Sequence, residues 1–405
     1  MSNTTALNIT NDIIESIDTS TGNDSIDVMI DSFDDMNLKD KLLRGIYGYG
    51  FEKPSLIQSK AIPVIINGHD VIAQSQSGTG KTGTFTIGTL QRIDEKINGV
   101  QAIIISHTRE LAHQICHVCS SIGQYLNVNP VLCIGGVDIK QTKIELENGP
   151  VIAIGTPGRI IDLIKRRYLS TKVLRILVID EADEMLSDSF IDQIKSIVQS
   201  LNETTQICLI SATMPFEMLE LTNKFMRNPK QILLEKENLT LDGIKQFYIN
   251  VENDLWKFET FCDLFDVISV SQTIVYVNSI KRGEDLKNEL KKKNFTVSLL
   301  HSDMEAKDRS LIMKEFRAGN TRILISTDLL SRGIDIHQIS IVVNYDIPKN
   351  KECYLHRIGR SGRFGRKGVA INLVSRYEER LLNDIMKHYD TFIDTMPENI
   401  QAFLS

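Results

Sequence analysis

The stretch DVIAQSQSGTGKT, residues 70–82, places a short apolar run directly before a loop rich in glycine and serine. An apolar helical segment begins near Thr84. This strand–loop–helix order indicates a parallel α/β sheet, and glycines let backbone N–H groups curl around phosphate oxygens at the start of the helix. Lys81 would then reach the β- and γ-phosphates of a nucleotide, and Thr82 would ligate Mg²⁺. Ser75 stands where the general pattern has its first glycine, so this loop alone leaves the assignment open.

Outward from this loop, β-branched runs alternate with helical stretches from Phe33 to the end of the chain. This alternation is the pattern of parallel sheets covered by helices. The expected strands are residues 70–74, 102–106, 131–136, 151–156, 176–181 and 206–213 in the first half, and 246–251, 273–278, 296–301, 322–327, 340–345 and 370–375 in the second. Two similar sets predict an α/β fold of two domains, each a mostly parallel sheet flanked by helices.

Composition sets the expected domain boundaries. Residues 1–31 hold six acidic and no basic residues among many Ser, Thr and Asn, which predicts a disordered acidic tail. The polar stretch 235–243 lacks apolar periodicity and ends in glycine, so we expect a linker at 237–243. The predicted domains are therefore residues 32–236 and 244–405.

The charge balance at first argues against a nucleic-acid partner. The 405 residues contain 46 Lys and Arg against 52 Asp and Glu, a net charge of -6, whereas nucleic-acid binders usually carry a basic face. The six acids of the tail account for the whole excess, so the two domains are near neutral and suit transient binding.

Apolar runs are too short to cross a membrane, and no signal sequence is visible. We expect a cytoplasmic monomer, with a nuclear location left open.

Six scattered cysteines predict reduced thiols rather than a disulfide framework. Cys116 and Cys119 form a C-x-x-C pair, but a second pair at the spacing of a structural zinc site does not follow. We therefore expect these two residues to be buried or half-buried on a helix.

A second chemical signal lies where the apolar run 176–179 ends in Asp180, Glu181, Ala182 and Asp183. Carboxylates at the carboxyl end of a strand beside a phosphate loop can hold Mg²⁺, here through Asp180, and can polarise an attacking water, here through Glu181. Together with the loop at 70–82, this predicts nucleotide hydrolysis.

Residues 180–183 spell DEAD, and the chain resembles the DEAD-box RNA helicases over essentially all of residues 32–405. The resemblance implies two tandem RecA-like domains and an RNA-dependent ATPase with ATP and Mg²⁺ as cofactors. Within the family, residues 33–55 are most similar to the translation initiation factor 4A group. This implies a role in translation initiation or mRNA metabolism.

The resemblance also assigns the nucleotide site. Gln58 would read adenine, since an amide donates and accepts at once. Arg360 and Arg363 would reach the γ-phosphate from the second domain and would act in catalysis with Lys81, Asp180 and Glu181. The implied nucleotide-binding residues are Phe51, Lys53, Gln58, Gly78, Thr79, Gly80, Lys81, Thr82, Gly83, Asp335, Arg360, Arg363 and Phe364, with Thr82 and Asp180 on the metal.

RNA contacts follow in the same way. The implied contacts are Thr108, Arg109, Gly135, Gly136, Thr156, Arg159, Arg309, Thr327 and Gly333, while Ser211 and Thr213 would couple the carboxylates to RNA binding. Two positions depart from the family pattern. His107 stands where the family usually has Pro, and Ala306 where it usually has Gln, which we expect to weaken support for Arg309.

These residues leave two activities open. The first is a helicase that clamps single-stranded RNA when ATP binds and locally opens short duplexes, aided by a protein scaffold or activator that bridges the two domains. The second is an ATP-gated clamp that holds a ribonucleoprotein complex with little unwinding. A DNA translocase of the same superfamily is a third hypothesis, which DNA-stimulated ATPase activity would reveal.

Overall fold

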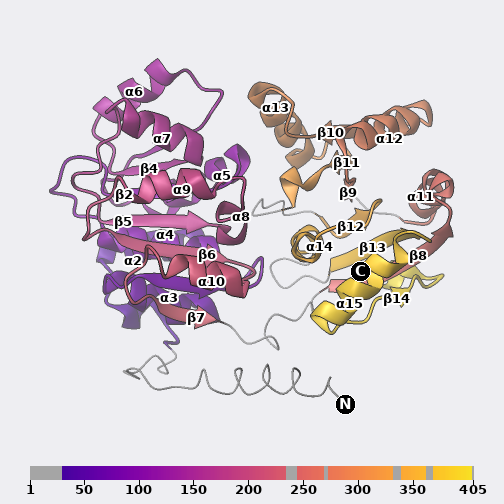
Figure 1. Ribbon diagram of the computed structural model, residues 1–405, viewed down its shortest axis with the longest axis horizontal. Coiled ribbons are helices and arrows are strands. Elements are labelled where there is room, and N and C mark those ends of the chain that lie inside the picture. Colours follow the sequence, from indigo (N-terminus) through magenta and orange to yellow (C-terminus); the bar gives the residue numbers. More distant parts are fainter. Residues whose placement is uncertain (1–29, 234–243, 269–271, 332–338, 362–367, 404–405) are drawn as a thin grey trace, which may run out of the picture.

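Two parallel sheets lie side by side in the computed structural model (Figure 1). The structure describes residues 30–233, 244–268, 272–331, 339–361 and 368–403. The predicted linker, and the predicted tail up to residue 29, lie outside the described residues. Those two predictions therefore remain expectations.

The first sheet has seven strands in the order β3-β4-β2-β5-β6-β1-β7. Its strands are β1 (Val71–Gln74), β2 (Ala102–Ile105), β3 (Pro130–Cys133), β4 (Ile152–Gly155), β5 (Ile176–Asp180), β6 (Gln206–Ser211) and β7 (Lys230–Leu233). All their pairings are parallel, and most strands are buried along their whole length. Strands covered on both faces read as continuous apolar runs, which explains why runs such as residues 102–105 show no alternation.

Helices cover both faces of this sheet. On one face α2 (Asp40–Tyr49), α3 (Leu56–Ile66), α4 (Lys81–Arg92) and α5 (Arg109–Ile122) pack on side chains such as Val71 and Ile104. The opposite face is covered by α7 (Pro157–Lys165), α8 (Ala182–Met185), α9 (Ile191–Val198) and α10 (Phe216–Thr222), which contact Ile72 and Ile103. Neighbouring strand residues thus belong to different cores, as the period of two in a strand requires. Helix α6 (Ile139–Glu147) follows β3.

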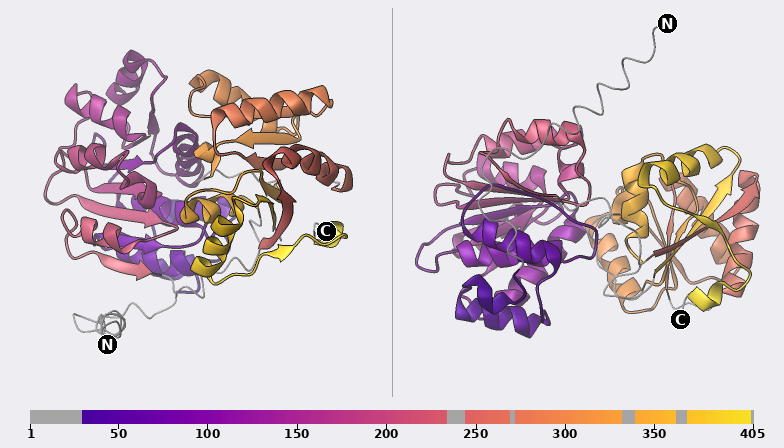
Figure 2. Two further views of the ribbon diagram at one scale, coloured as in Figure 1. Left: turned by 45° about the vertical axis from the view of Figure 1, so that its right-hand side comes forward. Right: turned by 90° about the horizontal axis from the view of Figure 1, so that it is seen from below.

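The second sheet repeats this design in the order β10-β11-β9-β12-β13-β8-β14, again with parallel pairings. Its strands are β8 (Ile244–Glu252), β9 (Thr273–Tyr276), β10 (Val297–Leu300), β11 (Ile323–Ser326), β12 (Ile341–Asn344), β13 (Gly368–Ser375) and β14 (Asp394–Thr395). Its helices are α11 (Lys257–Val267), α12 (Ile280–Lys292), α13 (Ala306–Arg317), α14 (Lys351–Ile358) and α15 (Glu379–Tyr389). Figure 2 shows helices on both faces of each sheet.

The predicted fold class is therefore confirmed, and each of the twelve expected strands has an observed counterpart. The edge strands β7 and β14 were not predicted, because four- and two-residue edge strands carry too few apolar residues to stand out. Among the described residues, no helix combines the length and apolarity needed to cross a membrane.

Candidate functional site

The phosphate loop lies between β1 and α4. Gly80 is the N-cap of α4 and has φ 100°, a left-handed conformation that glycine adopts without strain. Lys81 follows it, and its side chain is buried with Nζ donating to the Ser75 carbonyl oxygen at 2.9 Å. Burial lowers the pKa of Lys81, and the nearby carboxylates of Glu181 and Asp180 act in the opposite direction. The ammonium group is therefore held at the start of a helix, where anions are stabilised.

The two adjacent carboxylates end strand β5. Asp180 and Glu181 are 3% and 2% exposed, and Glu181 has φ 51° and ψ 54°, a left-handed conformation uncommon for a residue with a side chain. Burial, and next the charge of Glu181, raise the pKa of Asp180. Two buried carboxylates this close favour a cation between them and the phosphates, so the donor set fits Mg²⁺ held by Asp180 and Thr82.

The predicted adenine-reading residues lie against the phosphate loop. Gln58 is 2% exposed, accepts a hydrogen bond from Ser55 N at 2.8 Å, and lies near Gly80 with Nε2 3.4 Å from its carbonyl oxygen. A Cβ added at Gly83 would lie 2.8 Å from both Gln58 Nε2 and a ring carbon of Phe51. Gly83 therefore gives these two side chains room beside α4, whereas Lys53 is exposed.

The predicted coupling residues contact the last acid of the motif. Thr213 Oγ1 donates to Asp183 Oδ2 at 2.7 Å, and Ser211 Oγ accepts from Asp183 N at 3.3 Å. The same Asp183 oxygen lies 2.9 Å from His356 Nε2, which belongs to α14 of the second unit. Asp183 thus joins the loop after β6 to the second unit. The contact with His356 was not predicted.

A second contact between the units reaches the phosphate loop itself. Arg360 follows α14, is 2% exposed, and its guanidinium donates to Ser77 Oγ. The structure therefore brings this predicted catalytic arginine to the loop that holds Lys81. Four predicted site residues, Gly333, Asp335, Arg363 and Phe364, lie outside the described residues.

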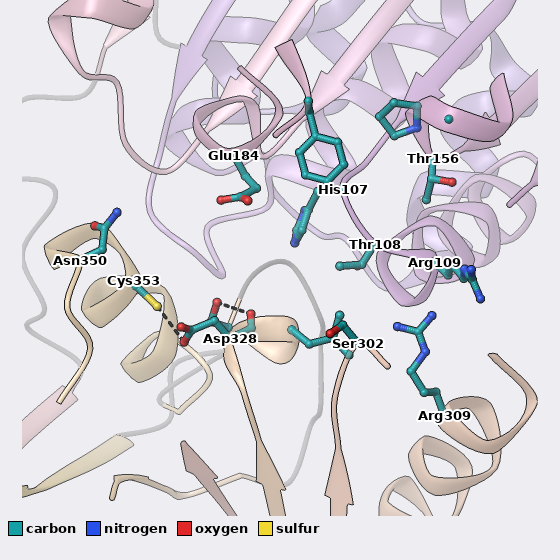
Figure 3. A pocket seen from close by; sticks show the side chains of 15 residues that line it. His107, Thr108, Arg109, Thr156, Glu184, Ser302, Arg309, Asp328, Asn350 and Cys353 are labelled. Carbon is teal, nitrogen blue, oxygen red and sulfur yellow. Dashed lines mark hydrogen bonds between the residues drawn. The ribbon is translucent and has the colours of Figure 1, made fainter. Parts of the chain in front are cut away.

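A cavity of about 660 Å³ lies between the two units (Figure 3). Four predicted RNA contacts line it, namely Thr108, Arg109, Thr156 and Arg309. Thr108 is the N-cap of α5, accepting from Leu111 N at 3.3 Å, so the start of that helix faces the cavity. The two arginines come from different units and converge on the same side of the cavity (Figure 3). Such a pair of like charges favours an anion nearby, and the Glu110 carboxylate supplies one to Arg309.

Among the described residues, the other predicted RNA contacts lie next to residues that line this cavity. Cβ atoms added at Gly135 and Gly136 would lie 3.1 and 2.9 Å from the Arg109 guanidinium, so both glycines lie against it. Arg159 donates to the Val137 carbonyl oxygen at 2.8 Å and therefore braces the loop after β3. Thr327 is half-buried at the end of β11, next to the cavity-lining Asp328.

Arg309 has a protein partner that the sequence did not indicate. Its Nε lies 3.3 Å from Glu110 Oε1 across the interface, and the two side chains are 6% and 10% exposed. Ala306, one of the two departures, lies near Gly136, where an added Cβ would be 3.0 Å from the alanine Cβ. At this point the two units therefore meet through a buried ion pair, Arg309 with Glu110, and two small residues, Ala306 and Gly136.

The expectation for the C-x-x-C pair is confirmed, and one buried arginine was not foreseen. Cys116 is half-buried and Cys119 is buried on α5, as expected, and both are free thiols. Arg357, in the basic run that begins in α14, is fully buried and donates to Asp328, Asn344 and Asn278. It therefore supports the second unit from inside rather than forming part of an exposed basic patch.

Comparisons with known proteins agree with this geometry. The family model described as DEAD/DEAH box helicase matches residues 55–221, and the model described as Helicase conserved C-terminal domain matches residues 256–365. The chain is 53% identical over 374 residues to eukaryotic initiation factor 4A of Caenorhabditis elegans, covering 92% of this chain and 93% of that protein. It is also 53% identical over 374 residues to the ATP-dependent RNA helicase eIF4A of Chaetomium globosum. That match covers 92% of this chain and 94% of that protein.

Solved structures add the arrangement of the two units. Dbp5 of S. cerevisiae bound to RNA and ADP BeF3 is 35% identical, with a TM-score of 0.87 over 92% of this chain and 97% of that one. A variant of Dbp5 bound to Nup159, Gle1, IP6 and ADP is 33% identical, with a TM-score of 0.64 over 90% and 97%. Identity and coverage are nearly equal, whereas the TM-score is higher for the first, so the present structure is more similar overall to the structure bound to RNA and ADP BeF3.

Proposed function

Because the chain belongs to the DEAD-box family of ATP-dependent RNA helicases, we propose that it couples ATP binding and hydrolysis to clamping of single-stranded RNA and local opening of duplexes. The observation that carries this proposal is the contact between Arg360 of the second unit and Ser77 in the phosphate loop of the first. The hydrolysis site is then complete only when the two units meet, which links turnover to closure around RNA.

At the nucleotide end, each group has a separate task. Lys81 binds the β- and γ-phosphates at the start of α4, and Gln58 with Phe51 orients the adenine beside Gly83. Glu181 accepts the proton of the attacking water, and Arg360, with Arg363, stabilises the charge that develops on the transferred phosphoryl group. Thr82 and Asp180 would hold Mg²⁺, which would neutralise charge at the phosphates when bound.

Asp183 links the hydrolysis site to RNA binding. Its carboxylate accepts from Thr213 and contacts His356, so the position of the second unit is set next to the catalytic Glu181. The same closure brings Arg309 to Arg109 at the cavity, where phosphates of a single strand would bind. Contacts to phosphates and sugars bind RNA without reading its sequence, and the 2′-hydroxyl distinguishes RNA from DNA.

The experiment that tests this function measures ATP hydrolysis by the full chain with no nucleic acid, with single-stranded RNA, and with DNA of the same sequence. We expect strong stimulation by RNA and little by DNA. Equal stimulation by both would instead favour the DNA translocase, and hydrolysis indifferent to nucleic acid would reject the coupling.

The alternative activity, a stable clamp with little unwinding, uses the same residues. A strand-displacement assay separates the two, because a helicase releases the displaced strand at each turnover. A clamp retains RNA in a long-lived ATP-bound complex. We favour the helicase, since the names of the relatives at 53% identity include that activity.

The cellular role is proposed from those relatives. Two of them are named as initiation factor 4A, which supports a part in translation initiation and a cytoplasmic location. Protein partners occur with a more distant relative, Dbp5, whose structure with Gle1 and Nup159 supports a scaffold that bridges the two domains here. Pull-down of the full chain with RNase treatment would test for such a scaffold, and a monomer is expected in its absence.

A further inference from the structure

His107, which stands where the family usually has Pro, lines the cavity between the two units. In Figure 3 its imidazole lies between Thr108 and Glu184. The backbone on either side is fixed, because Ser106 N donates to the Gly155 carbonyl oxygen at 3.0 Å and Thr108 caps α5. The half-buried ring is therefore presented to the cavity from a rigid position rather than from a flexible loop.

A second aromatic ring lines the same cavity. Phe190 is the N-cap residue of α9, and its carbonyl oxygen accepts from Gln193 N and Ile194 N at 2.9 and 3.0 Å. Its backbone is thus held by the helix that it starts, while its side chain is half-buried. Two aromatic residues from separate segments of the first unit therefore line the same cavity.

Charge divides this cavity into two parts (Figure 3). Arg109 and Arg309 lie on one side, and the carboxylates of Glu184 and Asp328 lie on the other, with His107 between Thr108 and Glu184. Phosphates are drawn to the arginines and repelled by the carboxylate of Glu184, whereas the charge of Asp328 is paired with Arg357. The uncharged part of a nucleotide, its base, should therefore lie toward His107 and away from the arginines.

We propose that His107 and Phe190 form a base-stacking subsite for one nucleotide of the bound strand, which gives this chain a preference for purines at that position. The inference rests on the proposed function, because it requires RNA in this cavity. Backbone contacts carry no sequence information, whereas aromatic side chains stack on bases, and larger bases stack more strongly. The subsite would therefore add selectivity that the phosphate contacts lack.

The test compares the affinity of the full chain for oligo(A) and oligo(U) RNA of equal length, with Mg²⁺ and a non-hydrolysable ATP analogue. Wild type should bind oligo(A) more tightly. His107→Ala should weaken oligo(A) binding about fivefold or more, the lower range for loss of one stacked base, and should narrow the difference between the two RNAs. His107→Phe should keep the preference, because it keeps an aromatic ring. Phe190→Leu, which keeps apolar volume, should also narrow the difference.

Tyr377→Ala is the matched control, since this aromatic residue is 91% exposed on the second unit and outside the cavity. Thermal melting of each variant checks folding. An unchanged oligo(A) to oligo(U) ratio in folded His107→Ala and Phe190→Leu would overturn the inference. Equal losses on both RNAs, with a weaker salt dependence, would also overturn it by making His107 a phosphate contact. Wild type that binds neither RNA would instead reject the proposed function, and the subsite with it.

Discussion

The two ends of the interface between the units are built differently. At the proposed nucleotide end, Lys81, Asp180 and Glu181 all come from the first unit and are already buried there. At the proposed RNA end, the cavity is lined by residues of both units, and Arg309 reaches Glu110 only because the units meet. The first end is thus built within a single fold and completed by Arg360 of the second unit, whereas the other end is formed by the docking of the two units.

This difference separates two kinds of residue. Groups organised within the first unit should set the rate of the chemical step, together with Arg360 once the two units meet. Groups that contact each other across the interface, such as His356 and Arg309, should set how strongly the binding of RNA and the binding of ATP affect each other. Substitutions at each end therefore test whether the two groups of residues affect different properties, the rate of hydrolysis at one end and the coupling of RNA and ATP binding at the other.

The largest effect is expected at Glu181. Glu181→Gln removes the proton acceptor while keeping the size of the side chain, so hydrolysis should fall by about 10²–10⁴-fold. RNA retention in the presence of ATP should persist, because closure does not need the proton acceptor. Phosphate release and filter retention of RNA measure the two properties. Turnover close to that of wild type would show that Glu181 is not the general base.

Arg360 should come next. Arg360→Ala removes one donor to the developing charge, for which about 10²–10³-fold loss of turnover is typical. ATP affinity should change little, since the contact belongs to the closed arrangement. Nucleotide titration and steady-state hydrolysis separate these effects. A large loss of ATP affinity at unchanged turnover would contradict the role in catalysis.

The contact between His356 and Asp183 is expected to have a moderate effect. Both side chains are nearly buried, and residues in one hydrogen-bond network show interaction energies of about 0.5–3 kcal/mol. A double-mutant cycle with His356→Ala and Asp183→Asn, read out as RNA stimulation of hydrolysis, should show this coupling. Additive losses in the cycle would mean that the contact does not transmit closure.

The smallest effect is expected at Glu110. Glu110→Gln leaves the guanidinium of Arg309 without its charge partner in the closed arrangement, so RNA affinity with ATP should weaken by about tenfold or less. Glu147→Gln is the matched control, because its partner Lys143 is exposed and such pairs contribute little. Tighter RNA binding by Glu110→Gln would show that Glu110 competes with RNA for Arg309.

The sequence by itself was sufficient for the fold class, and it also indicated the groups that we propose for the nucleotide end. Apolar runs such as residues 102–105 and 176–179 predict parallel strands, because they must be buried on both faces. Parallel strands place their carboxyl ends at one edge of a sheet. The loop after β1 and the acids that end β5 were therefore expected to meet, and the structure places them together.

Only the tertiary structure decided the contacts between the units. His356 with Asp183, and Arg309 with Glu110, are 173 and 199 residues apart in the chain, and no local pattern links such pairs. The burial of Arg357 and the hydrogen bond from Arg159 to the Val137 carbonyl oxygen also depend on packing. The sequence around an arginine does not show whether its side chain is buried or exposed. Local sequence fixes what each strand end carries, and docking of the two sheets fixes which of those groups meet.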